Sequence, residues 1–195
     1  MTVPSTIRLY GTVTDSIVDG PGLRFSVFVQ GCTHGCPGCH NPESWPFEGG
    51  TEESIDELVK RVLGNKLCTG VTLSGGDPFQ QPQASAEVAR RVKAAGRNVW
   101  TYTGYLYEDL LRQLEALGNS DLLPEERDRL EAVRDLLALS DVLVDGPFVQ
   151  SKRSLELKYC GSSNQRLIDL AQTRAQGRVV LWEDYDVFPT KPPSW

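Results

Sequence analysis

No apolar stretch of this chain approaches the ~20 residues that a membrane-spanning helix needs. The first residues, MTVPSTIRLYGTV, also lack the charged start and apolar stretch of a secretory signal peptide. Positive charge is scarce, because 20 Lys and Arg face 26 Asp and Glu and give a formal net charge of -6. An acidic surface repels phosphate groups. These absences predict a cytoplasmic protein whose partners include neither a membrane nor a nucleic acid.

Histidine and cysteine are rare, with 2 and 5 residues respectively. An odd number of cysteines in a chain of 195 residues is unlike the disulfide framework of a small secreted domain. Three cysteines and both histidines fall in one run, GCTHGCPGCHNPESW: Cys32, His34, Cys36, Cys39 and His40. Cys68 and Cys160 stand alone, and we expect Cys68 to be a small buried apolar residue. The run predicts a metal site.

Apolar periodicity predicts an alternation of strands and helices. The expected strands cover residues 23–29, 71–73, 98–102, 141–144 and 178–182, and the expected helices cover 55–63, 83–95, 110–117 and 125–139. Such alternation indicates a parallel sheet with right-handed crossovers.

The chain is shorter than the ~250 residues of a complete eight-stranded barrel. The sequence therefore predicts an α/β fold, an incomplete open (βα)-barrel of about five to six parallel strands. A flavodoxin-like doubly wound sheet is the alternative. We expect one domain over residues 1–195, with an irregular proline-rich tail from Pro189 to Trp195.

Four unusual sequences each follow an expected strand: GCTHGCPGC, SGGDP, TGY and DGPF. In parallel α/β folds, the loops at the carboxyl ends of the strands meet on one face, where active sites lie. Glycine, proline and aspartate also form plain turns. The combination with a cysteine cluster nevertheless predicts that these loops form one site.

Three closely spaced thiols leave several kinds of site open. A structural zinc usually takes four ligands, whereas a four-iron cluster usually takes four cysteines. The spacing alone favours neither, and a redox disulfide at Cys36 and Cys39 ranks third. With three cysteine ligands, one iron of a cluster would keep an open position. SGGD is a candidate for holding the ligand of that iron, because paired glycines allow a close backbone approach.

The spacing of Cys32, Cys36 and Cys39, followed by Ser74-Gly75-Gly76-Asp77-Pro78, resembles the radical S-adenosylmethionine (radical SAM) enzymes. Further motifs, DGPG, YTGY, VLVDG and GSSNQR, extend the resemblance over roughly residues 15–170. Together they are similar to the enzymes that activate anaerobic ribonucleoside-triphosphate reductases. The resemblance implies that the open barrel is the partial TIM barrel of radical SAM enzymes.

The resemblance also implies cofactors and site residues. Cys32, Cys36 and Cys39 would be the metal ligands and the catalytic residues of a [4Fe-4S] cluster. S-adenosylmethionine would bind its open iron and be cleaved reductively, and the resulting 5'-deoxyadenosyl radical would generate a glycyl radical on the partner enzyme. The implied cofactor-binding residues are Gly38, Cys39, His40, Gly75, Gly76, Asp77, Thr103 and Asp145.

The implied partners are the reductase, as a glycyl-radical enzyme, and a one-electron donor such as flavodoxin or ferredoxin. Two positions depart from relatives: Pro147 stands where a lysine can occur, and Cys160 stands where an arginine can occur. The competing hypotheses are an activase of another glycyl-radical enzyme, a small-molecule radical SAM enzyme similar to a deazaguanine synthase, and a non-catalytic zinc-binding module.

Overall fold

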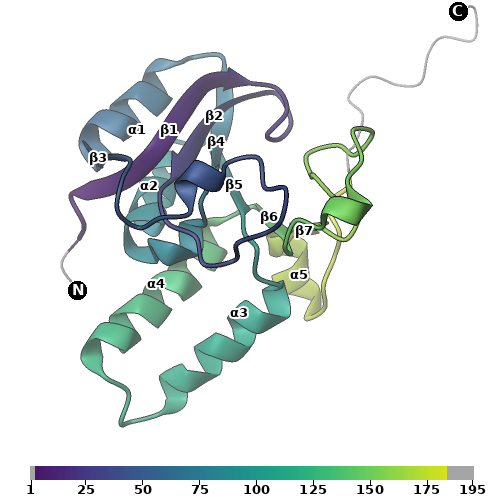
Figure 1. Cartoon of the computed structure of the whole chain (residues 1–195). Helices are drawn as coiled ribbons and strands as arrows, with labels where there is room; N and C mark the ends of the chain where they lie inside the picture. The colour runs from purple at the N-terminus through teal and green to yellow at the C-terminus, as the bar shows by residue number, and fades with distance from the viewer. Residues whose placement is uncertain (1–2, 184–195) are drawn as a thin grey trace, which may run out of the picture.

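The computed structural model describes residues 3–183, which are built around one seven-stranded sheet (Figure 1). In spatial order the strands are β3 (Thr51–Ser54), β1 (Thr6–Ser16), β2 (Leu23–Val29), β4 (Cys68–Gly75), β5 (Asn98–Tyr102), β6 (Val142–Asp145) and β7 (Arg166–Asp169). β2, β4, β5 and β6 are mutually parallel. β1 is antiparallel to β2 and β3, and β7 is antiparallel to β6. The sheet is mixed and open.

The expected open α/β fold is confirmed, but four adjacent strands are parallel instead of five to six. The difference arises at the edges, where β1 and β3 form an antiparallel arm beside β2 and the chain reverses between β6 and β7. The four parallel strands follow chain order without a reversal. A doubly wound sheet requires such a reversal, so the flavodoxin-like alternative is wrong.

Helices cover one face of the parallel strands, in agreement with right-handed crossovers that all lie on one side (Figure 1). They are α1 (Ile55–Gly64), α2 (Pro82–Ala94), α3 (Tyr107–Leu114), α4 (Pro124–Leu139) and α5 (Leu170–Gln176). α2 and α4 each begin with a proline, which has no N–H to leave unpaired in the first turn. Alternate strand residues such as Val27, Leu73 and Leu143 are fully buried in the core cluster that also contains helix residues.

The opposite face of the sheet is filled near the amino ends of the strands by a polar cluster around Arg24. This side chain is fully buried, donates to Thr72 Oγ1 (3.0 Å) and to the Val71 carbonyl (2.6 Å), and lies 5.7 Å from the Trp100 ring centroid. Burial lowers the pKa of Arg24 to about 10. Asp19, in the DGPG turn, accepts a 2.6 Å hydrogen bond from Ser26 Oγ. The DGPG motif thus contributes to the inner packing.

The expected strands at 23–29, 98–102 and 141–144 match β2, β5 and β6 closely, and the four expected helices match α1 to α4. The expected strand at 178–182 is wrong. That segment contacts β7 through one bridge, between Ile168 and Leu181, and forms no longer ladder. β1, β3, β7 and α5 were not predicted.

Cys68 is buried, as expected. No helix within residues 3–183 is both long enough and apolar enough to cross a membrane. The expected irregular tail from Pro189 to Trp195 lies outside the described residues.

Candidate functional site

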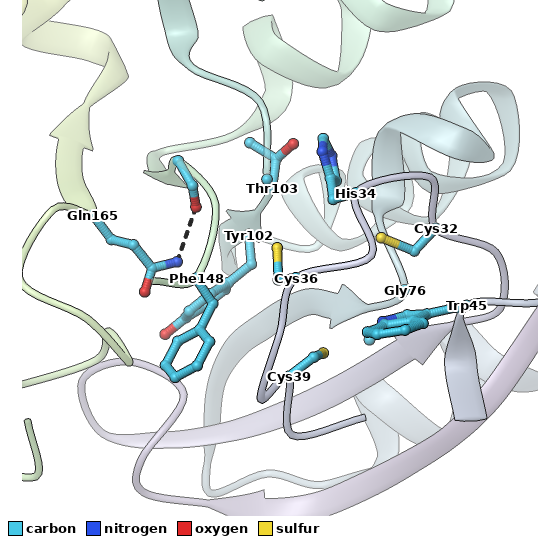
Figure 2. A pocket seen from close by; sticks show the side chains of 13 residues that line it. Cys32, His34, Cys36, Cys39, Trp45, Gly76, Tyr102, Thr103, Phe148 and Gln165 are labelled. Atoms are coloured by element: carbon cyan, nitrogen blue, oxygen red, sulfur yellow. Dashed lines mark hydrogen bonds between the residues drawn. The ribbon is translucent and has the colours of Figure 1, made fainter. Parts of the chain in front are cut away.

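The four unusual sequences meet at the carboxyl ends of β2, β4, β5 and β6, as the sequence predicts. A cavity of about 110 Å³ lies between them (Figure 2). Its lining comes from all four loops and from the β7 region: Cys32, His34, Cys36, Cys39, Trp45, Gly75, Gly76, Tyr102, Thr103, Gly104, Gly146, Phe148 and Gln165. The cavity therefore combines the cysteine cluster with residues more than 100 positions away in the chain.

The cysteine loop is fixed at its base by backbone hydrogen bonds. Gly31 N donates to the Ser44 carbonyl (2.7 Å), and Cys32 N donates to the Trp45 carbonyl (3.0 Å). Cys39 N donates to the Cys36 carbonyl (3.0 Å), which closes a turn around the last two thiols. These bonds return the chain past its own start and leave all three thiols facing the same cavity (Figure 2).

The three thiols are free and half-buried. Burial raises the pKa of the Cys32 thiol, with Asp77 adding to the same effect and nearby backbone N–H groups opposing it. Among residues 3–183, no three His, Cys, Asp or Glu side chains are arranged to hold a single metal ion. The thiols instead surround a cavity several times larger than the ~30 Å³ share of one water molecule. This donor set fits a polynuclear iron–sulfur cluster with cysteine ligands.

Asp77 connects three of the loops from a fully buried position. Its Oδ1 accepts a hydrogen bond from Phe79 N (2.9 Å). Its Oδ2 accepts from Thr103 Oγ1 (2.9 Å) and Gly104 N (3.0 Å) and pairs with His34 Nε2 at 2.8 Å. The carboxylate is thus occupied by the cysteine loop on one side and the β5 loop on the other, and it does not line the cavity.

Gly75 and Gly76 line the cavity where β4 ends against the cysteine loop. Gly75 has a φ of +97°, in the region that favours glycine. A Cβ on Gly76 would overlap the backbone of Gly31. Gly76 N donates to the Val29 carbonyl (2.7 Å) and Asp77 N to the Gly31 carbonyl (2.9 Å). The paired glycines therefore allow the end of β4 to lie directly against the backbone of the cysteine loop, and their close approach to a ligand stays a prediction.

Gly38 and His40 lie beside the cavity and are not part of its lining. A Cβ on Gly38 would stand 3.0 Å from the side-chain carbon of Gln150. The His40 ring lies 5.7 Å from the ring of Phe148, centroid to centroid. Both residues thus lie against the segment after β6.

Asp145, at the end of β6, is fully buried and also lies outside the lining. It accepts a hydrogen bond from Tyr107 N (2.8 Å) and is paired with Arg166, whose Nε lies 3.0 Å from Oδ1. Arg166 also contacts both carboxylate oxygens of Glu108, at 3.0 and 2.7 Å. The hydrogen bonds from Arg166 lower the pKa of Glu108. Arg166 therefore neutralises a carboxylate that the chain has buried at the site.

Thr103 lines the cavity, and its hydroxyl both donates to Asp77 and accepts from Tyr105 N (3.1 Å). Sequence reasoning identified neither Tyr102 nor Gln165 as a site residue. Tyr102 donates its hydroxyl to the Tyr159 carbonyl (2.6 Å), and Gln165 Nε2 donates to the Gly146 carbonyl (3.0 Å; Figure 2). Both residues lie within quoted motifs, YTGY and GSSNQR.

Trp45, Phe148 and Gly146 also line the cavity and were not predicted as site residues. They could have been recognised as site residues from their position in GCTHGCPGCHNPESW and DGPF, the motifs that directly follow β2 and β6. In Figure 2, Trp45 lies on one side of the three sulfur atoms, with His34 and Thr103 on the other.

Comparisons with known proteins match most of this chain to one family model and to activating enzymes. The profile of the 4Fe-4S single cluster domain family matches residues 18–168. The anaerobic ribonucleoside-triphosphate reductase-activating protein of Escherichia coli K12 is 34% identical over 158 residues, which cover 76% of this chain and 90% of that protein. The pyruvate formate-lyase-activating enzyme of Listeria monocytogenes is 34% identical over 189 residues, covering 94% of this chain and 70% of that enzyme.

Among solved structures, QueE from Escherichia coli matches with a TM-score of 0.40 and 12% sequence identity, over 89% of this chain and 91% of QueE. A match this loose bears on neither the fold nor the function.

Proposed function

This chain belongs to the 4Fe-4S single cluster domain family, and we propose that it is a radical SAM activating enzyme that installs a glycyl radical on an anaerobic ribonucleoside-triphosphate reductase. Its cofactors are a [4Fe-4S] cluster and S-adenosylmethionine. The observation that carries the proposal is the cavity that joins three free thiols to paired glycines. We also interpret the four parallel strands with helices on one face as an incomplete (βα)-barrel.

Cys32, Cys36 and Cys39 would hold the cluster, leaving one iron for the amino and carboxylate groups of S-adenosylmethionine. When bound, the reduced cluster and S-adenosylmethionine supply the 5'-deoxyadenosyl radical that removes a hydrogen atom from a glycine of the partner. The thiols fit this role because each is unpaired with another cysteine and each faces the cavity.

The chain's other residues would bind and orient the cofactor. Gly75 and Gly76 bring backbone polar groups to the cavity wall, where they can pair with an ammonium group. Gly38 and His40 remain predicted contacts of the adenine side. Thr103 is positioned at the wall, although its hydroxyl already has two partners.

Asp77 and Asp145 remain predicted cofactor-binding residues, but their observed contacts favour positioning roles. Each carboxylate is fully buried and is held by groups of the protein. Asp77 holds the cysteine loop against the β5 loop, and Asp145 holds β6 against Arg166. Trp45 and Phe148 add apolar surface beside the thiols, which would limit water at the reacting atoms.

Anaerobic reconstitution tests the proposal. The loaded protein should hold about four iron and four sulfide per chain. It should produce 5'-deoxyadenosine in the presence of dithionite, and a glycyl doublet should appear by electron paramagnetic resonance after mixing with an anaerobic ribonucleoside-triphosphate reductase. Cys36→Ala should abolish the cleavage, whereas Cys160→Ala, a matched cysteine outside the cavity lining, should retain it. One bound zinc without sulfide would support the zinc module instead.

A second candidate partner is pyruvate formate-lyase. The favouring observation is the match to the Listeria monocytogenes enzyme, which extends over 94% of this chain. The same resonance experiment separates the two, because the glycyl doublet should appear only on the correct partner. A protein-borne doublet on neither enzyme, together with efficient S-adenosylmethionine cleavage, would favour a small-molecule substrate.

A further inference from the structure

We propose that Lys152 and Arg153, the basic pair on the loop between β6 and β7, form the docking site of an acidic one-electron donor protein. This inference rests on the proposed function, because a cluster that cleaves S-adenosylmethionine reductively must receive an electron from outside the chain. Lys152 ends the short helix η4 (Gln150–Lys152), and Arg153 follows it. Both side chains are exposed.

The first supporting observation is the local reversal of charge. The chain as a whole carries a formal charge of -6. Residues 146–168 contain four cations and a single carboxylate, Glu156, so this segment carries +3 and the rest of the chain carries -9. Arg166 is neutralised by its carboxylate partners. The positive charge directed to solvent therefore includes Lys152 and Arg153.

The second observation is that these two cations lack partners. Within residues 3–183, the basic side chains without a hydrogen bond or ion pair are Lys66, Arg129, Arg134, Lys152, Arg153 and Arg178. Only Lys152 and Arg153 are adjacent in this group, and they belong to the segment after β6, which contributes Gly146 and Phe148 to the cavity lining. No neighbouring carboxylate offsets the field of an unpaired cation, which suits such cations for steering a partner.

The third observation is that the segment carrying the basic pair packs against the cysteine loop. Gln150, in the same short helix, packs against Gly38, which lies between Cys36 and Cys39. Phe148 packs against His40, directly after Cys39. Lys152 and Arg153 follow Gln150 by two and three residues and do not line the cavity, which is left for S-adenosylmethionine and the glycine loop. Leu155, 87% exposed, adds an apolar contact surface next to the pair.

This charge distribution favours the binding of an acidic electron-donor protein at the basic pair. The -9 carried outside the segment repels an acidic protein, whereas the basic pair attracts it, so the donor is oriented toward the cysteine loop. One electron would leave the reduced centre of the donor and enter the cluster held by the three cysteines. The donor is oxidised by one electron, the cluster is reduced by one, and no bond forms or breaks in this step.

The test measures cluster reduction by stopped-flow absorbance under anaerobic conditions, with reduced flavodoxin as the probe. The variant Lys152→Glu/Arg153→Glu is compared with Lys66→Glu/Arg134→Glu. The control changes the net charge equally, and its two side chains are also exposed and unpaired but lie away from the site. At low salt, the first variant should lower the second-order rate constant about tenfold or more. The control should stay within about twofold, and added salt should remove the difference.

Reduction by dithionite separates a failure of the docking site from a failure of the proposed function. Excess dithionite should reduce the cluster of both variants and of the native protein to the same final extent and should support the same S-adenosylmethionine cleavage. Equal flavodoxin rates in the two variants would overturn the docking site while leaving the proposed function intact. Absence of dithionite-driven cleavage in the native protein would overturn the proposed function itself. Normal flavodoxin reduction with loss of glycyl radical formation would assign the surface to the glycyl-radical enzyme and overturn the inference.

Discussion

Replacing Asp77 by asparagine tests whether this carboxylate positions the loops or binds the cofactor. Asparagine keeps the shape of the side chain but has one acceptor oxygen where aspartate has two. In the native protein the Asp77 carboxylate contacts four hydrogen-bonding groups, which include the backbone N–H groups of Phe79 and Gly104. A hydroxyl can rotate and an imidazole can change tautomer, but a backbone N–H cannot reverse. Either orientation of the new amide therefore leaves one of these two N–H groups facing an NH₂ group.

The magnitude follows from these contacts. A buried donor left unpaired costs about 1–3 kcal/mol, and hydrogen bonds to a charged group are worth about 1.5–3 kcal/mol each. Because two of the four partners can adapt, we expect Asp77→Asn to lower the free energy of unfolding by about 2–4 kcal/mol. The matched control is Asp56→Asn, whose side chain is 78% exposed and is paired with Arg91. It should change the same quantity by less than about 1 kcal/mol.

The assay is urea unfolding of the cluster-free chain under reducing anaerobic conditions, followed by circular dichroism. A second measurement is S-adenosylmethionine binding to the loaded protein. A positioning residue predicts lost stability in the cluster-free chain before any cofactor is added. If Asp77→Asn matches Asp56→Asn in unfolding but weakens S-adenosylmethionine binding, the positioning argument is refuted and Asp77 is a direct ligand.

The same geometry supports two further predictions. Gly104→Ala should destabilise the cluster-free chain by about 1–3 kcal/mol, because the new Cβ would overlap the His34 ring. Adding His34→Ala to Gly104→Ala should recover part of the lost stability, and no recovery would contradict the overlap. The control Gly118→Ala should be nearly neutral, because a Cβ at Gly118 would meet no other atom. Arg166→Gln should cost about 3–5 kcal/mol near neutral pH, because it leaves a buried carboxylate unpaired. Arg166 lowers the pKa of Glu108 below its usual 4.5, so the part of the stability difference that comes from this ion pair should shrink as pH falls below 4.5. A stability difference between the native chain and Arg166→Gln that grows in acid would contradict this assignment.

The central elements could be predicted because their sequence signals are local. The run from Leu23 to Val29 is rich in aromatic and β-branched residues, and the apolar residues of α1 repeat at helical spacing. The edge strands lack such signals. β3 contains two adjacent glutamates and β7 begins with an arginine, so their strand structure depends on neighbours that supply the hydrogen bonds. Val179 to Trp182 has a stronger strand composition but meets β7 over too short a length to form a ladder.

Prediction of the site has a similar limit, which follows from what a motif specifies. The roles of the three cysteines and of the two glycines can be predicted from the motif, because sulfur ligation and close backbone approach depend on those residue types themselves. The direction of a carboxylate depends on the donors that surround it. Those of Asp77 come from His34, 43 positions earlier, and from Thr103 and Gly104, 26 and 27 positions later. A motif centred on SGGDP contains none of these three residues. Asp77 therefore occupies the expected place at the end of β4, while its side chain connects the loops around the cavity.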